Sequence, residues 1–270
     1  MCRLLAFALT EEFDVGYLLK LLVNASRREI LASFKQHDDG WGYAVALKED
    51  EWRLLSYKTR VPIWEDSSIS ALERLLRRYS IALGLVHTRK ASKNTPVDTF
   101  SAHPFSFTSN DGSLVFFAQN GGIDKVKAYE LLSNRVKVDL DSVSDTFIHA
   151  MLLREFVEKN DGKLIDGFIK LHELLHDKGL YGSCSNILIL KFSPRDKVEL
   201  LVARIIYGEA RREYCELYEA KHGSGCYIIA SSTLTRYDEG ILEFAPLGKN
   251  MVVVYSLEDE YVSRKAISID

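Results

Sequence analysis

The chain opens with residues 1–9, MCRLLAFAL, in which Met-Cys-Arg leads directly into a short and almost wholly apolar run. Such a run predicts a strand that is covered on both of its faces. Removal of Met1, which a small second residue permits, would leave Cys2 with a thiol and an α-amine on one residue. Because an α-amine titrates at roughly 7.7–8.0, it can take the thiol proton and later return it, as covalent acyl chemistry requires. The alternative is that Cys2 is only a small buried residue in front of the strand.

The length and net charge of the chain limit the kinds of protein that it can be. The chain has 270 residues, of which 47% are hydrophobic, so it can bury a sizeable core. No stretch has the composition of a linker, and we therefore expect one domain over residues 2–270. The 35 basic and 38 acidic residues give a net charge of −3. This balance does not predict a nucleic acid as a partner.

The four cysteines show no CxxC spacing, which argues against a structural zinc site, and we expect no metal or cofactor. The apolar run that follows Arg3 is too short for a signal peptide and is followed by acidic residues. No segment approaches the ~18 apolar residues that predict a membrane span. We expect a cytoplasmic protein with reduced thiols and no membrane contact.

Apolar periodicity predicts a strand-rich chain with helices between the strands. Strands are expected over residues 4–9, 43–47, 52–58, 81–86, 114–119, 184–192, 197–207, 227–231 and 250–255. Helices are expected over residues 14–22, 26–34, 67–79, 124–132, 145–156 and 164–176. The polar, turn-rich residues 92–110 are expected to form an exposed loop. This order predicts sheets that are stacked on one another, with helices on the outside.

The segment His-Thr-Arg-Lys-Ala-Ser, residues 87–92, directly follows a predicted buried strand. Side chains at such a strand end point into a cleft. Arg89 offers a planar fork that can bind a carboxylate through two parallel hydrogen bonds. The alternative is a surface arginine in a structural ion pair.

The segment Gln-Asn-Gly-Gly, residues 119–122, also ends a predicted strand. The side-chain amide of Asn120 and the backbone N–H of Gly121 can converge on a developing oxyanion, since glycine allows a close approach. The alternative is an ordinary Asn-Gly hairpin turn.

The segment Ser-Asp-Thr, residues 144–146, opens a predicted helix. Asp145 could accept hydrogen bonds from the ammonium group of a substrate, or it could cap its own helix. A carboxylate has enough lone pairs to serve both roles.

Three histidine-containing segments are less informative. His37 begins His-Asp-Asp-Gly-Trp-Gly, which we expect to be architectural because no partner lies at metal-ligand spacing. His103 lies in the polar segment and could line a pocket. His172 and His176 are four residues apart on a predicted helix, a spacing that can hold a metal. Without a visible third ligand, we expect them on a solvated face.

These motifs occur together in one order along the chain. They are Met-Cys-Arg-Leu-Leu, His-Asp-Asp-Gly-Trp-Gly, His-Thr-Arg-x-Ala-Ser, Ala-His-Pro-Phe, Asn-Gly and Ser-Asp-Thr. The combination resembles the class II glutamine amidotransferases, and most closely their compact, stand-alone branch. Residues 227–235, YIIASSTLT, are similar to the late Ala-Ser-Glu-Pro-Leu segment of that branch, with Ser232 and Thr233 in place of Glu-Pro. Gln119 stands where the family usually has His.

The resemblance implies an α+β fold, the four-layer αββα sandwich of the N-terminal nucleophile hydrolases. It implies that Cys2 attacks the side-chain amide of glutamine, that ammonia leaves, and that water resolves a γ-glutamyl thioester. Arg89 matches the arginine that holds the substrate carboxylate, and Asp145 matches the acid that receives the ammonium group. Asn120 and Gly121 match the oxyanion hole. Ser92 stands where the family places a small hydroxyl residue near the bound amino acid.

Three functional hypotheses remain open from the sequence. A glutaminase subunit would pass ammonia to a partner synthetase, since no residues here resemble an acceptor site or a P-loop. A stand-alone hydrolase would cleave a γ-glutamyl bond in a larger compound with the same head-group contacts. A catalytically silent glutamine-binding or scaffold protein would keep Arg89 and Asp145 but would need no free amine on Cys2.

Overall fold

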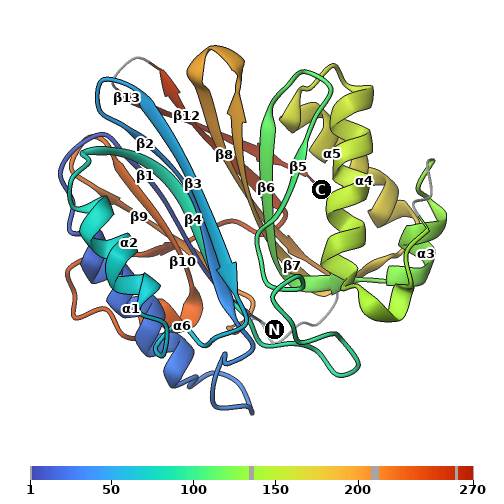
Figure 1. Cartoon of the computed structure of the whole chain (residues 1–270), viewed down its shortest axis with the longest axis horizontal. Coiled ribbons are helices and arrows are strands. Elements are labelled where there is room, and N and C mark those ends of the chain that lie inside the picture. The colour runs from blue at the N-terminus through green and yellow to red at the C-terminus, as the bar shows by residue number, and fades with distance from the viewer. Residues whose placement is uncertain (1, 134–136, 208–212, 259–260, 270) are drawn as a thin grey trace.

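The computed structural model describes residues 2–133, 137–207, 213–258 and 261–269. Over these ranges the strands form two antiparallel sheets that lie face to face, with helices on both outer sides (Figure 1). The four layers therefore follow the order αββα, which confirms the predicted fold class. No helix in the described ranges is long and apolar enough to cross a membrane.

The larger sheet has seven strands, and β1 lies near its middle. In spatial order they are β11 (Ala245–Pro246), β9 (Leu217–His222), β10 (Cys226–Ser231), β1 (Arg3–Leu9), β4 (Ile81–Thr88), β2 (Trp41–Lys48) and β3 (Trp52–Thr59). Pairing of β1 with β10 on one side and β4 on the other satisfies its backbone hydrogen bonds.

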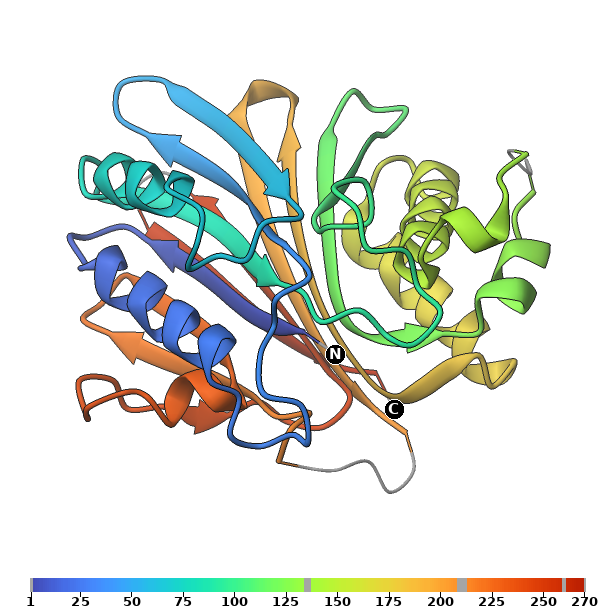
Figure 2. The ribbon, with the colours of Figure 1, turned by 60° about the horizontal axis from the view of Figure 1, so that its bottom comes forward.

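The smaller sheet has six strands, of which β6 and β7 approach the beginning of β1 (Figure 2). In spatial order they are β13 (Tyr261–Ser268), β12 (Met251–Glu258), β8 (Lys197–Ile206), β7 (Tyr181–Ser193), β6 (Leu114–Ile123) and β5 (Phe105–Thr108). A bulge interrupts the β6–β7 pairing after Gly121.

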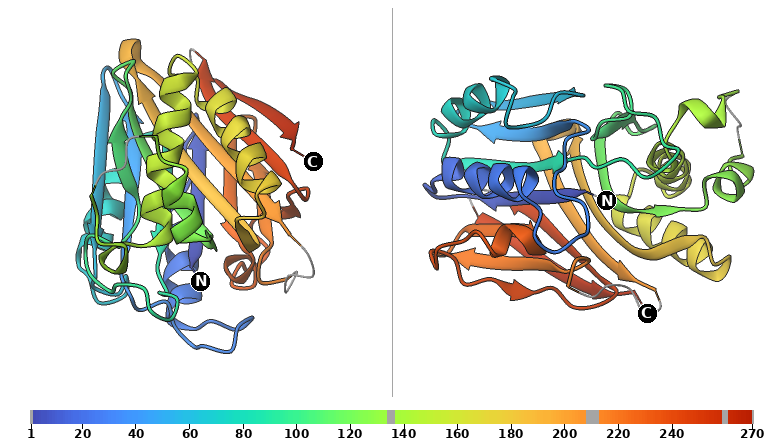
Figure 3. Two further views of the ribbon diagram at one scale, coloured as in Figure 1. Left: turned by 90° about the vertical axis from the view of Figure 1, so that its right-hand side faces the viewer. Right: turned by 90° about the horizontal axis from the view of Figure 1, so that it is seen from below.

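Helices cover the outer face of each sheet, as two further views show (Figure 3). The larger sheet carries α1 (Val15–Arg27), α2 (Ser68–Leu76) and α6 (Ser232–Thr235). The smaller sheet carries α3 (Lys125–Glu130), α4 (Asp145–Lys159) and α5 (Leu164–Asp177). Two short 3-10 helices span Leu140–Ser142 and Pro194–Asp196.

Strand β1 is buried along its whole length, as its apolar sequence predicts. Leu5 and Phe7 face the helices of the larger sheet, whereas Leu4 and Ala6 face the smaller sheet. Because side chains alternate along a strand, Cys2 shares the inner face with Leu4, and Arg3 shares the outer face with Leu5. The alternation therefore places the thiol between the two sheets.

The predicted strands and helices are confirmed with one exception. Residues 26–34 are not a second helix, because α1 ends at Arg27 and the chain then bends. The Glu29 side chain replaces helical hydrogen bonds there, since Oε1 accepts from the backbone N of Ile30 at 3.0 Å and of Leu31 at 2.7 Å. A contact between a side chain and its own backbone thus overrides the helical pattern.

The prediction that residues 92–110 form an exposed loop is wrong for the second half of this range. That half contains β5, which pairs with β6, and Ser101, Ala102 and His103 are buried. The polar composition of this half therefore did not predict that it contains a paired strand and buried residues.

The prediction that the thiols are reduced is wrong for two of the four cysteines. Cys184 and Cys215 form a disulfide, with their Cα atoms 6.2 Å apart, while Cys2 and Cys226 are free and buried. The two cysteines are 31 residues apart and belong to no sequence motif. They are brought together only because β7 packs against the segment before β9.

The disulfide should stabilise the fold measurably. It joins residues that are 31 apart in sequence, and a loop of that size predicts a contribution of roughly 3.7 kcal/mol to the free energy of unfolding. We expect reductant to lower the melting temperature of the wild-type protein and of Cys226→Ala, but not that of Cys215→Ser. A melting temperature of the wild type that does not respond to reductant would contradict this expectation.

Candidate active site

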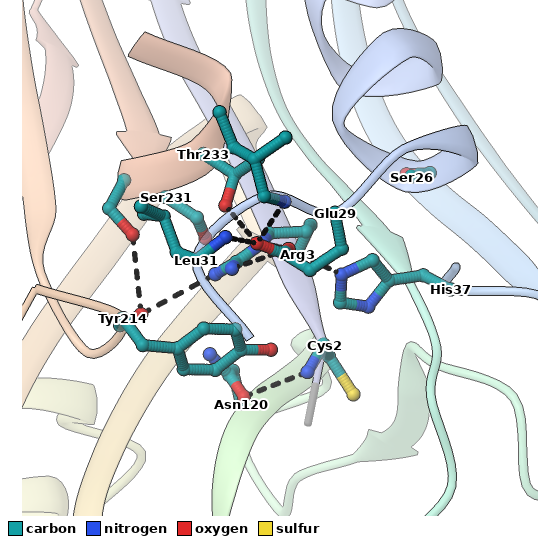
Figure 4. Close-up of polar contacts among 12 residues, drawn as sticks. Cys2, Arg3, Ser26, Glu29, Leu31, His37, Asn120, Tyr214, Ser231 and Thr233 are labelled. Carbon is teal, nitrogen blue, oxygen red and sulfur yellow. Dashed lines mark hydrogen bonds and ion pairs between the residues drawn. The ribbon is translucent and has the colours of Figure 1, made fainter. Parts of the chain in front are cut away.

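Cys2 lies at the start of β1 and faces the smaller sheet, and 7% of it is exposed. Its backbone N donates a hydrogen bond of 2.9 Å to Oδ1 of Asn120 on β6 (Figure 4). This bond joins the two sheets at the thiol-bearing residue. The Sγ atom points away from the bond, and the backbone carbonyl of Lys90 lies 4.0 Å from it.

The thiol of Cys2 is acidic for a buried cysteine. Burial acts to raise its pKa, whereas positive charge at His87 and at the N terminus lowers it, and the pKa falls from 9.0 to about 6. His87 pairs with Leu4 across β4 and β1, so it lies on the same sheet face as Cys2. Its ring is 4.1 Å from that of His103, centroid to centroid, and its side-chain contact with the Cys2 thiol also lowers the pKa of that thiol.

Asn120 and Gly121 lie inside β6, paired with β7, and not in a hairpin turn. The Oδ1 atom of Asn120 is bound to Cys2, whereas its Nδ2 atom is buried and has no partner in the described part of the chain. Gly121 has a φ of +126°, and any side chain there would collide with the carbonyl oxygen of Cys184. Only glycine suits this position.

Arg89 follows β4 directly and is 3% exposed. Its backbone is fixed by the predicted architectural motif, because its N donates to the carbonyl of Gly40 at 2.8 Å and its carbonyl accepts from Asp39 N at 3.0 Å. The Oδ2 atom of Asp39 also accepts from Ala91 N at 2.8 Å. The guanidinium Nη1 of Arg89 is buried and has no hydrogen-bond partner in the described ranges.

Asp145 is half-buried in the first turn of α4, and Ser144 is the residue that caps this helix, through a hydrogen bond of 3.2 Å from Phe147 N. The carboxylate of Asp145 is therefore not consumed by capping. Its Oδ2 accepts from Ile123 N at 3.1 Å. Burial raises its pKa above the usual range, although this backbone contact acts in the opposite direction.

The residues singled out in the sequence meet in one place. Cys2, Arg89, Ser92, Gly121 and Asp145 all line one pocket of about 30 Å³. It adjoins a cavity of about 360 Å³, which is lined by Asn120 and shares Ser92, Gly121 and Asp145 with the pocket. Ser92 is exposed at the rim. The guanidinium of Arg89, the carboxylate of Asp145 and the residues Asn120 and Gly121 thus lie around the pocket that contains the thiol.

Gln119 precedes Asn120 in β6, and its side chain connects the smaller sheet with the helix layer that covers it. Its Nε2 donates to Ser185 Oγ at 2.8 Å, and its Oε1 lies 3.0 Å from Nδ1 of His149 on α4. Burial lowers the pKa of His149 to about 3, so this histidine is neutral and donates to Gln119. No sequence pattern pointed to a role for His149.

The remaining histidines have structural contacts. His172 is buried, not solvated as expected, because Nε2 lies 3.1 Å from the carbonyl of Ile269 and Nδ1 lies 3.3 Å from the Tyr181 hydroxyl. His176 is exposed. Within the described ranges no three His, Cys, Asp or Glu side chains are grouped so as to hold a metal ion.

Known proteins share the sequence family and the fold of this chain. The family model described as "Glutamine amidotransferases class-II" matches residues 1–189. The fold is similar to a solved structure of the allosteric regulatory enzyme of purine biosynthesis, with a TM-score of 0.61, 14% identity, and coverage of 100% of this chain and 49% of that one. A comparison with curated proteins gives no match.

Two further solved structures share the fold. Glutamine phosphoribosylpyrophosphate amidotransferase from B. subtilis has a TM-score of 0.57 and 14% identity over 100% of this chain and 49% of that one. A glutamine aminotransferase class-II domain protein from Silicibacter pomeroyi has a TM-score of 0.53 and 15% identity over 98% of both chains. The chain spans about half the length of the first two of these structures and nearly all of the third.

The acidity of Cys2 can be measured directly. Because the thiolate is the reactive species, we expect the rate of alkylation by iodoacetamide at Cys2 to rise with a midpoint near pH 6 and to level off above it. Burial raises the pKa of Cys226, so this cysteine serves as an internal control that reacts slowly at neutral pH. A midpoint near 9 for Cys2 would show that the positive charge does not act on the thiol.

Proposed function

Because the chain belongs to the class II glutamine amidotransferases, whose glutamine hydrolysis uses an N-terminal cysteine, we propose that Cys2 of this enzyme forms a γ-glutamyl thioester during turnover. We also propose that residues 2–270 act as a single glutaminase domain. The cytoplasmic location expected from the sequence stays a prediction.

The proposal rests on two hydrogen-bond donors that have no partner among the described residues. Asn120 Nδ2 and Arg89 Nη1 are both buried and lack hydrogen-bond partners in the described ranges. An unsatisfied buried donor costs about 1–3 kcal/mol, so a native protein keeps one where a ligand completes it. An oxyanion beside Cys2 and a carboxylate beside Arg89 would satisfy both.

The proposed steps balance in protons and bonds. Removal of Met1 converts the nitrogen that now bonds Asn120 Oδ1 into the α-amine of Cys2. The amine holds the thiol proton while Sγ attacks the amide carbon, and the oxygen charge is received by Asn120 Nδ2 and the Gly121 N–H. The proton passes to the leaving nitrogen, ammonia departs, and the thioester remains. Water, deprotonated by the same amine, then releases glutamate and restores the thiol.

Arg89 and Asp145 would hold the zwitterionic head of the substrate. The guanidinium would bind the α-carboxylate, and the Asp145 carboxylate would accept from the α-ammonium group. A bound ammonium would also offset the burial that raises the pKa of Asp145. Ser92, at the rim of the pocket, would contact the bound amino acid from the solvent side.

The adjoining cavity favours a second candidate within the same chemistry. A leaving group larger than ammonia has room in the 360 Å³ space next to Asn120 and Gly121. The enzyme would then act alone on a γ-glutamyl amide, whereas a subunit of an ammonia-transferring complex would be slow alone and faster with its partner synthetase. Turnover of purified protein on glutamine and on a panel of γ-glutamyl amides separates the two.

The nucleophile is tested first. We expect Cys2→Ala to reduce glutamine hydrolysis to background, because no other described group in the pocket can form the thioester. Intact mass of the wild type should show loss of Met1 and one adduct with a glutamine analogue carrying a diazoketone, and the variant should show none. Wild-type turnover by Cys2→Ala would overturn the assignment, and a folded wild type without an adduct would favour the silent glutamine-binding protein.

The head-group contact is tested by Arg89→Lys. Loss of the planar fork removes one charged hydrogen bond of about 1.5–3 kcal/mol, so we expect KM to rise roughly 10- to 100-fold while kcat changes much less. Arg78→Lys makes the same change on an exposed surface and should behave as the wild type. An unchanged KM for Arg89→Lys would show that this arginine does not bind the substrate.

A further inference from the structure

An ion pair is buried directly beneath the nucleophile. Arg3 follows Cys2 in β1, its side chain leaves the opposite face of the sheet, and it is fully buried. Its Nε and Nη2 atoms lie 2.6 and 2.5 Å from Oε2 of Glu29, in the bend after α1 (Figure 4). Both side chains are 0% exposed.

Glu29 is saturated with hydrogen bonds. Besides the two backbone donors of its own bend, its Oε1 accepts from Thr233 Oγ1 at 2.7 Å, and its Oε2 lies 2.9 Å from Nε2 of His37. Burial acts to raise the pKa of Glu29, but His37 and Arg3 outweigh it and lower the pKa to about 2. Glu29 is therefore ionised, and the neutral His37, whose pKa burial lowers to about 4, donates to it.

The other side of Arg3 is equally enclosed. Its guanidinium carbon lies 3.9 Å from the centre of the Tyr214 ring, and Nη1 donates to the Tyr214 carbonyl at 3.4 Å. Ser232 Oγ donates to that same carbonyl at 3.3 Å, and Ser231 Oγ accepts from Leu4 N at 2.8 Å. The segment 231–233, whose role the sequence left open, thus supplies three hydroxyl groups around the start of β1.

Stability alone gives little reason for this arrangement. Two charges taken out of water incur a desolvation cost that their attraction often only offsets, and well-packed apolar residues can replace such a pair without loss. What the pair does supply is a fixed position for Arg3, since its Nε donates to Glu29 and its Nη1 donates to the Tyr214 carbonyl. The next residue toward the N terminus is Cys2, whose N must reach Asn120 Oδ1 across the sheets.

We propose that Glu29 is a positioning residue of the active site: by binding Arg3, it fixes the beginning of β1 so that Cys2 is held against Asn120. Thr233 and His37 assist by orienting the Glu29 carboxylate. The inference rests on the proposed function, because it assigns a role in placing the nucleophile for attack. A misplacement of about 1 Å at a reacting atom can reduce the rate about 100-fold.

The test compares Glu29→Gln with the wild type in four measurements. We expect kcat for glutamine to fall about 10- to 100-fold with KM within about twofold, since Arg89 and Asp145 are untouched. The rate of adduct formation with the diazoketone analogue should fall in parallel. The rate with iodoacetamide, which needs no aligned pocket, should change less than about threefold, and the melting temperature records any loss of fold.

Asp111→Asn is the matched control. Asp111 pairs with the buried Lys191 at 3.1 Å, at the far end of β6 from Asn120, so the variant also leaves a buried cation unpaired. It should lower the melting temperature without changing kcat. Should Glu29→Gln fail to fold, the double variant Arg3→Met with Glu29→Met removes both charges, and we expect it to fold with the same kinetic defect.

The outcomes separate the inference from the proposed function. A wild type that turns over glutamine, beside a folded Glu29→Gln or double variant with wild-type kcat and adduct rate, overturns the positioning role alone. Equal losses of kcat in Glu29→Gln and Asp111→Asn would mean that the pair is merely structural. A wild type without turnover or adduct overturns the proposed function itself.

Discussion

A single amide links the two sheets at the point where chemistry would occur. The Oδ1 atom of Asn120 accepts the hydrogen bond from Cys2 N, and this leaves Nδ2 of the same side chain without a partner in the described ranges. Because an amide is planar and its two ends are fixed relative to each other, the bond that places the nucleophile also aims the donor. One contact therefore positions both the thiol-bearing residue and the Nδ2 donor of Asn120.

Two arginines of the site are buried, and they differ in their contact with carboxylates of the described residues. Arg3 is enclosed by Glu29 and Tyr214, so its charge is used inside the protein. Arg89 keeps a bare Nη1 in the pocket, so its charge is free to meet a ligand. The same residue type builds the scaffold in one place and would recognise substrate in the other, and the difference lies in whether a carboxylate of the protein reaches it.

The sequence alone predicted the layers well. Apolar runs such as residues 4–9 and 81–86 predicted strands that are buried on both faces, and the structure confirms them as β1 and β4. The motif residues from Cys2 to Asp145 were also identified before the structure, and the structure brings them around one pocket. Local signals sufficed because Cys2 and Arg89 adjoin strand ends and Asp145 begins a helix, where the pattern itself changes.

What failed were predictions that depend on partners far along the chain. Residues 26–34 have a helical pattern, but Glu29 turns to Arg3 and bonds its own backbone, which ends the helix. His172 lies on a helix face that meets the carbonyl of Ile269, and Cys184 meets Cys215. The sequence determined the strands that apolar runs mark, the family resemblance and the set of chemical groups, since these follow from local order along the chain. Only the tertiary structure decided which of those groups are already bonded and which remain open, because hydrogen bonding between distant residues is set by packing in three dimensions.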